Sequence, residues 1–437
     1  MMEQSDYTSR SLTSKEKLPV HPPFFYGWLI VVIAALGAFF SGPGQTYTIS
    51  VFMDIYIEEF SASRTMISSL YSGATLAAGL LLFLVGRIID KKGQRYTALL
   101  VGTMLAAACF WNSAVLGPVM MIIGFFMLRL FGQGSMTLVP NTLIPQWFSK
   151  QRGRAFSFMT LGVLASAAAM PPIHFFLIET WGWRFAWQFW GVLLLLVFVP
   201  LAYIFIRNKP EDVGLLPDDA GKNGDKEKAA AASARERKAS SWSVREAVRS
   251  KAFWFALFCA VVPSLVNTGI TIHLFSILGE KGIERPVIAF LLSLMPIAAF
   301  VFTLTAGFVV EKIKVHHLYG LSFLLSAGTL ILLIYAQSVW MIFLYIILWG
   351  VFDGTSKICN NMIWPEYFGL DNLGKLKSFA TTAVVIGSAL GPLPFGMAFD
   401  YFGQYNEILW IMMGLPAVAM VLAFSSPPPQ KKSRTGK

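Results

Sequence analysis

The chain has 437 residues, of which 55% are hydrophobic and only 14% are charged. Soluble globular proteins carry about 25% charged residues, so this composition excludes an ordinary soluble enzyme. The net charge of +11 suggests nucleic-acid binding, because basic chains neutralise phosphates. The positions of the basic residues along the chain decide whether that interpretation holds.

Long runs without a charged residue recur along the chain, and a helix of about 20 apolar residues crosses a bilayer. The sequence therefore predicts an all-α membrane protein with twelve transmembrane helices in two six-helix bundles. The expected helices are 25–53, 65–88, 97–116, 118–145, 154–178, 185–206, 253–279, 286–310, 316–336, 338–362, 378–399 and 406–425.

The basic residues orient these helices. An even number of helices places both termini on one side of the membrane, and cytoplasmic segments are enriched in Lys and Arg. With that side cytoplasmic, 29 of the 35 basic residues lie in cytoplasmic segments, four lie outside and two lie within the membrane. We expect a multi-pass protein of the inner cell membrane with cytoplasmic termini, and the basic excess reflects orientation rather than nucleic-acid binding.

A polar stretch from 207 to 241 divides the helices six and six, and a short amphipathic helix is expected from Trp242 to Lys251. The expected parts are a cytoplasmic N-tail 1–24, a first bundle 25–206, a cytoplasmic linker 207–252, a second bundle 253–425 and a cytoplasmic C-tail 426–437.

The two halves also resemble each other in sequence. Four pairs of residues share an offset of 221: Gly86 and Gly307, Pro171 and Pro392, Glu179 and Asp400, and Gly182 and Gly403. A parallel repeat of six helices is typical of transporters whose two bundles rock about a site near the bilayer midplane.

The loop after the second helix carries the run Gly86-Arg-Ile-Ile-Asp90-Lys91-Lys92-Gly93-Gln94-Arg95. It resembles the loop signature of the major facilitator superfamily, with Gln94 in place of a basic residue. Gly86 permits close helix approach, Gly93 permits a tight turn, and Asp90 suits a helix N-terminus. We expect a gate at the cytoplasmic face formed by Gly86, Asp90, Lys91, Gly93 and Arg95; the alternative is a basic loop that only sets orientation.

Further segments look like the monocarboxylate porter and oxalate/formate antiporter branch of that superfamily: Phe25–Trp28, Gln146–Ala155 and Trp364–Gly369. The resemblance implies a carrier of small organic anions, proton-linked or exchanging, without ATPase activity. The first, eighth and eleventh helices lack the basic residues that members of this branch often carry there. The identity of the substrate therefore does not carry over.

Three charged residues lie in the interior of expected helices, away from the helix ends: Arg129, Asp353 and Lys357. Charges at membrane depth are costly and mark functional sites. Asp353 and Lys357 are four residues apart and share one helix face. We expect Lys357 to bind a substrate carboxylate and Asp353 to accept the coupled proton; the alternative is a permanent ion pair that orients the helix.

A polar and small-residue stripe surrounds this pair, and we expect it to face the central cavity: Gly350, Asp353, Gly354, Lys357 and Asn361. Arg129 opens a segment that resembles the fourth-helix signature of the superfamily, and its guanidinium suits a carboxylate. Its alternative role is a structural or coupling charge. Further expected substrate ligands are Gln45, Tyr47 and Asn267. Each belongs to a row of polar residues on one helix face, and such a row could instead be a surface where two helices pack together.

The sequence thus predicts a monomeric secondary active transporter of a small organic anion, coupled to a proton or working by exchange, in contact with membrane lipid. We expect no cofactor, no metal and no enzymatic activity, because no nucleophile–base pair or metal-ligand cluster is apparent. Two alternatives stay open: an exporter of a larger amphipathic compound, and a membrane sensor that does not transport.

Overall fold

The structure is a computed structural model that describes residues 18–20, 22–148, 151–215, 242–310, 312–369 and 372–429, and every regular element in these ranges is helical. The elements of the first half are α1 (Gly27–Phe40), η1 (Gly42–Gly44), α2 (Thr46–Glu59), α3 (Arg64–Ser113), α4 (Pro118–Met127), η2 (Leu128–Ser135), α5 (Met136–Trp147), α6 (Arg152–Trp181), α7 (Trp183–Leu193), η3 (Leu194–Phe198), α8 (Val199–Phe205) and η4 (Pro210–Val213).

The second half begins with a short helix and continues with long ones. Its elements are α10 (Val244–Arg249), α11 (Lys251–Gly279), α12 (Arg285–Val309), α13 (Val315–Tyr335), α14 (Val339–Phe368), α15 (Leu373–Leu390), α16 (Pro392–Phe402) and α17 (Asn406–Phe424). Within the described ranges the chain makes twelve membrane-length passes, as the sequence predicts. Helix α3 provides two of them, and Gly93, with φ of +82°, marks the turn between the two.

One predicted helix is wrong in its continuity. The first expected span, 25–53, is interrupted by η1, a short 3-10 turn that contains Pro43, and Gln45 after it adopts an extended backbone with ψ of 155°. Proline cannot donate a backbone hydrogen bond, so the helical ladder breaks here and nearby carbonyl groups need other donors. The pass then continues in α2 as far as Glu59 rather than ending at Met53.

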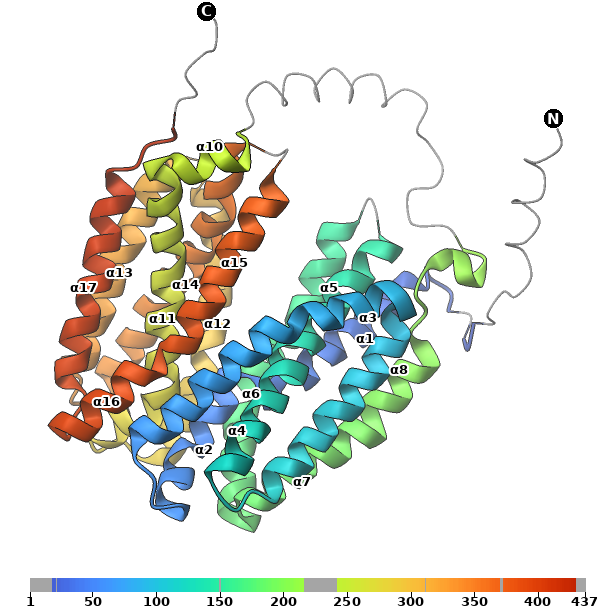
Figure 1. The fold of residues 1–437 in the computed structure, drawn as a ribbon, viewed down its shortest axis with the longest axis horizontal. Coiled ribbons are helices and arrows are strands. Elements are labelled where there is room, and N and C mark those ends of the chain that lie inside the picture. Colours follow the sequence, from blue (N-terminus) through green and yellow to red (C-terminus); the bar gives the residue numbers. More distant parts are fainter. Residues whose placement is uncertain are drawn as a thin grey trace, which may run out of the picture.

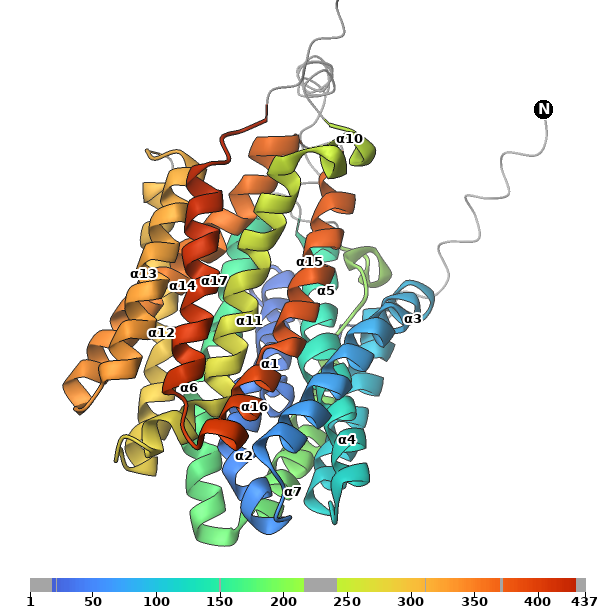
Figure 2. The same ribbon diagram turned by 60° about the vertical axis from the view of Figure 1, so that its left-hand side comes forward.

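The helices gather into two bundles, the first built from α1 to α8 and the second from α11 to α17 (Figure 1). The bundles contact each other through α3 with α15 and α16, α2 with α11, and α6 with α12. They diverge toward the end of the molecule where α10 lies, which we call the α10 end, and meet at the opposite end, which we call the far end. Figure 2 shows α16 and the start of α3 together at the far end.

Candidate functional site

Arg129 is a buried guanidinium that has no carboxylate partner among the described residues. It lies in the π-helical segment η2, and its side chain is 2% exposed. Its Nη1 donates to the Gly44 carbonyl at 3.0 Å and to Thr46 Oγ1 at 3.4 Å, while the guanidinium carbon lies 5.0 Å from the centre of the Tyr71 ring. Its Nε has no hydrogen-bond partner among the described residues. An uncompensated buried charge is costly, so this position suits an anion.

The break in the first pass explains why Arg129 reaches Gly44. A Cβ added to Gly44 would lie 2.2 Å from the Leu128 carbonyl oxygen and 2.7 Å from Gly132 Cα. The backbones of the first and fourth passes are therefore in direct contact, which only glycine permits. This contact places the carbonyl that the broken helix frees next to the guanidinium.

Gln45 and Tyr47 follow the same break but bond within their own bundle. Gln45 Nε2 donates to Ser41 Oγ at 3.1 Å. The Tyr47 hydroxyl donates to Ser166 Oγ at 2.9 Å, and Ser166 in turn donates to the Phe39 carbonyl at 2.8 Å. Tyr47 therefore links α2 to α6 in this arrangement.

A second polar group lies in the other bundle. Lys357 Nζ lies 2.5 Å from Asp353 Oδ2, and Asn267 Nδ2 of α11 donates to Asp353 Oδ1 at 3.2 Å. The Trp349 indole N–H donates to Asn267 Oδ1 at 3.2 Å. The side chain of Asp353 is 8% exposed whereas that of Lys357 is 60% exposed, so the ammonium group remains open to a ligand.

The expectation that the whole stripe on α14 faces a cavity is wrong for its glycines. A Cβ on Gly350 would lie 2.6 Å from Ala298 Cβ, and one on Gly354 would lie 2.6 Å from the Thr303 backbone nitrogen. Both glycines therefore pack against α12, as small residues do where membrane helices approach closely.

The structure thus brings the predicted substrate residues together in two groups. Arg129 lies near the break that carries Gln45 and Tyr47 in the first bundle, and Asn267 lies with Asp353 and Lys357 in the second. Sequence reasoning missed Trp349, although it stands four residues before Asp353 and so shares its helix face.

The predicted gate residues lie at the α10 end. Arg95 donates from its backbone to Asn208 Oδ1 at 2.9 Å and from its guanidinium Nη2 to the Tyr203 carbonyl at 2.9 Å, so these contacts stay within the first bundle. Asp90 and Lys91 are exposed. A Cβ on Gly86 would meet nothing within 4 Å, so the close helix approach expected there is absent from this arrangement.

A third group, which sequence reasoning missed, joins the two bundles at the far end. Arg64 Nη1 lies 2.6 Å from both Asp54 Oδ1 and Ser276 Oγ, and Ser276 donates to the same carboxylate oxygen. The Asp400 carboxylate accepts from the backbone N–H of Arg64 at 3.2 Å and of Thr65 at 2.9 Å. The repeat contains a signal for these residues, because the offset of 221 also relates Arg64 to Arg285.

His273 lies in α11, three residues before Ser276, and is fully buried. Its Nε2 lies 3.1 Å from the Pro392 carbonyl oxygen and 3.2 Å from Ser68 Oγ of the first bundle, and its Nδ1 lies 3.1 Å from the Tyr405 hydroxyl. A carbonyl oxygen only accepts, so Nε2 carries the proton in this arrangement. The imidazole of α11 therefore contacts α3, α16 and the residue that precedes α17.

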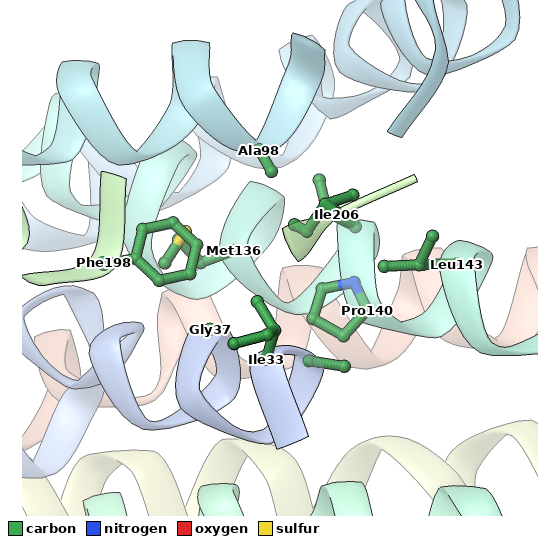
Figure 3. A pocket seen from close by; sticks show the side chains of 10 residues that line it. Ile33, Gly37, Ala98, Met136, Pro140, Leu143, Phe198 and Ile206 are labelled. Carbon is green, nitrogen blue, oxygen red and sulfur yellow. The ribbon is translucent and has the colours of Figure 1, made fainter. Parts of the chain in front are cut away.

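A small void lies inside the first bundle and is too small to hold a ligand. Its lining is entirely apolar, and its volume of about 10 Å³ is no larger than a single water (Figure 3). The side chains that surround it include Ile33, Met136 and Phe198. The void is a packing defect between helices.

Comparison with known proteins agrees with this architecture. A mouse protein named monocarboxylate transporter 14 is 27% identical over 214 residues, which are 46% of this chain and 41% of that protein. A probable L-galactonate transporter of Escherichia coli is 29% identical over 36% of this chain and 34% of its own length. A multidrug resistance protein, MdtG of Dickeya zeae, is 22% identical over 83% of this chain and 85% of its own length. The matches to the first two relatives thus span well under half of their lengths.

Solved structures share the fold at low identity. A bacterial homologue of the human lysosomal transporter Spinster, in an inward-facing and occupied conformation, matches with a TM-score of 0.73 and 15% identity over 93% of this chain and 97% of that one. The inward-open xylose transporter XylE of E. coli matches with a TM-score of 0.71 and 16% identity over 94% and 98%. The profile of the Major Facilitator Superfamily matches residues 27–284 and 257–437. The chain therefore belongs to the Major Facilitator Superfamily, whose members are membrane transporters.

Proposed function

We propose that this transporter carries a small organic anion with a carboxylate group, coupled to a proton or in exchange for a second anion. The observation that carries the proposal is Arg129, a buried guanidinium with no carboxylate partner among the described residues. A bound carboxylate would supply the missing negative charge and accept from the guanidinium fork. Two of the relatives are named for a monocarboxylate and for L-galactonate, which are both carboxylates.

The proposed roles follow the two groups. Arg129 binds the carboxylate from the first bundle, and Lys357 approaches it from the second. Asp353 takes up the coupled proton when Lys357 turns toward the anion, and Asn267 holds Asp353 in place. Gln45 offers an amide from the break, and Tyr47 reaches the ligand once it leaves Ser166.

We also propose how the protein sits in the membrane. The distribution of basic residues favours an inner-membrane protein with the α10 end in the cytoplasm, working as a monomer. The divergence of the bundles toward that end corresponds to an inward-facing carrier (Figure 1). In the opposite conformation the motif with Asp90, Lys91 and Arg95 would close the α10 end.

Uptake into proteoliposomes tests the proposal. Short monocarboxylates are offered to the purified protein, to Arg129→Lys, and to Arg184→Lys as the control, since Arg184 is an arginine paired with Glu59 at the exposed surface. Lysine keeps the charge but loses the fork, so uptake by Arg129→Lys falls about tenfold or more, which corresponds to about 1.4 kcal/mol. The control keeps the parent rate.

Two results contradict the proposal. One is a parent rate of carboxylate uptake in Arg129→Lys. The other is a thermal-shift screen in which only bulky apolar compounds stabilise the protein, which would favour an exporter of amphipathic compounds such as the relative named for multidrug resistance.

A further inference from the structure

The internal repeat relates two seams between the bundles at the far end. The α3–α16 seam joins the start of α3 to the end of α16, and the α6–α12 seam joins the end of α6 to the start of α12. The offset of 221 relates their residues pair by pair: Arg64 and Arg285, Thr65 and Pro286, Glu179 and Asp400, Gly182 and Gly403. The two seams therefore occupy equivalent positions of the repeat, so their contacts can be compared residue by residue.

The α3–α16 seam is held by hydrogen bonds from the backbone. The first N–H groups of a helix have no acceptor within the helix. A carboxylate at this end can accept from them, and its negative charge is also attracted by the positive end of the helix dipole. Asp400 of the second bundle supplies that carboxylate to the N–H groups of Arg64 and Thr65. The Arg64 guanidinium also lies 4.3 Å from the centre of the Phe399 ring. The N-terminus of α3 is thus bound by the opposite bundle.

Among the described residues, the α6–α12 seam lacks these bonds, although the repeat places Arg285 and Glu179 there. Pro286 has no N–H, so the start of α12 has lost the donor that corresponds to Thr65. Glu179 is exposed and makes no hydrogen bond with the described residues of α12. Arg285 lines a small crevice together with Glu179 but lies 3.4 Å from Glu58 instead, in an exposed pair.

We propose that Asp400 is the latch of the far-end gate: its carboxylate keeps the far end shut by capping α3 from the opposite bundle, and the cap must break before that end opens. Glu179, its counterpart in the repeat, has no such role. The proposal concerns the closure of the carrier and holds whichever substrate is transported.

A cysteine introduced at Ser72 reports on this gate. Ser72 lies one turn after Ser68 on the same face of α3 and is 4% exposed, so a polar maleimide reaches it only when the seam opens. The three native cysteines are buried, and the parent chain without Ser72→Cys gives the background rate. Purified protein in lipid nanodiscs is labelled without substrate, so the result does not depend on the proposed anion.

We expect Asp400→Asn to raise the labelling rate about tenfold, the change that a shift of about 1.4 kcal/mol in a two-state equilibrium produces. Glu179→Gln removes the same charge from the equivalent place and leaves the rate within about twofold of the parent. Equal rates in these two variants overturn the proposal.

A backbone variant tests the same bond from the other side. Thr65→Pro removes one of the two donors to Asp400, copies the residue found at 286, and falls in the first turn, where helices tolerate proline. We expect faster labelling than in the parent, and little further increase when Asp400→Asn is added. The amide keeps only one acceptor oxygen and no charge, so both changes weaken the same cap. Labelling at the parent rate in a Thr65→Pro protein that elutes as a single species in size-exclusion chromatography also overturns the proposal.

Discussion

Three charged side chains at membrane depth differ because their surroundings differ. Arg129 is enclosed by backbone and an aromatic ring, Asp353 is held by an amide and an ammonium group, and Lys357 is largely open. A carboxylate with two fixed partners can exchange one of them when a ligand arrives, whereas a guanidinium bound only to neutral acceptors gains most from a new anion. These surroundings support the proposal that Asp353 takes up the proton and Arg129 binds the ligand.

Asp353→Asn separates coupling from binding. The amide keeps the shape of the side chain and an acceptor for Asn267 but cannot take up a proton. We expect uptake driven by a pH gradient to fall at least about tenfold, while exchange of labelled for unlabelled substrate at equal pH continues. Asp212→Asn, which changes an exposed carboxylate of η4, serves as the control. Loss of both activities with a normal yield of folded protein would indicate a structural ion pair instead.

The charged residues could be found from sequence because each stands out in an apolar run. Their partners could not, since the contact between Arg129 and Gly44 depends on a broken helix and on two backbones touching. Trp349 was within reach of helical periodicity, but nothing in the sequence shows that its N–H faces α11.

At the scale of elements, two glycines of α3 differ in their surroundings: Gly93 forms a tight turn, and Gly86 lies beside open space. Gly93 has φ of +82°, and a Cβ there would lie 2.6 Å from the Asn208 side chain. Gly86, seven residues earlier, has open space around it. The turn at Gly93 therefore requires glycine in this conformation. At Gly86 no neighbouring group comes close enough to require the absence of a side chain.

Gly86→Ala tests whether that space is filled in another conformation. Alanine suits a helix better than glycine by about 1 kcal/mol, so thermal unfolding of the variant is unchanged or moves to higher temperature. If the α10 end closes over Gly86, transport nevertheless falls severalfold, because the added methyl group blocks close approach. Gly93→Ala is the contrasting variant, and its strained φ should lower the unfolding temperature. Full transport by a stable Gly86→Ala protein would exclude Gly86 from the gate.

The number and order of the passes followed from apolar runs, but their internal breaks did not. The Gly42-Pro43-Gly44 run is a turn signal, but it lies within an apolar run long enough to cross a bilayer. Such a run is normally interpreted as one continuous helix, so the break was not predicted. The π-helical shape of η2 has no signature in composition.

At the scale of the whole molecule, the bundles touch at one end and diverge at the other (Figure 1). The repeat predicts two similar halves, but it cannot tell which end is closed, because the same sequence must adopt both conformations. That choice depends on small differences in contact energy between the ends, such as the bonds of Asp400.

A disulfide between α3 of the first bundle and α15 of the second should arrest the carrier. A Cβ built on Gly79 lies 3.0 Å from Val385 Cγ1, so cysteines at these two positions fall within the reach of a disulfide. We expect oxidation of the double variant to abolish transport and a reductant to restore it, with either single variant as the control. Transport that continues after complete cross-linking, judged by loss of free thiols, would mean that α3 and α15 need not separate.

The three charges within the helices also have an electrical consequence. Two are positive and one is negative, so the empty carrier has one unpaired positive charge at membrane depth. A potential of 100 mV acts on one charge with about 2.3 kcal/mol when it crosses the whole field. A monoanion that binds without a proton cancels that charge, so exchange of two monoanions would be nearly independent of voltage. A monoanion that binds together with a proton on Asp353 leaves one positive charge, as in the empty carrier. The membrane potential would then act equally and oppositely on the loaded and the empty steps of proton-coupled transport.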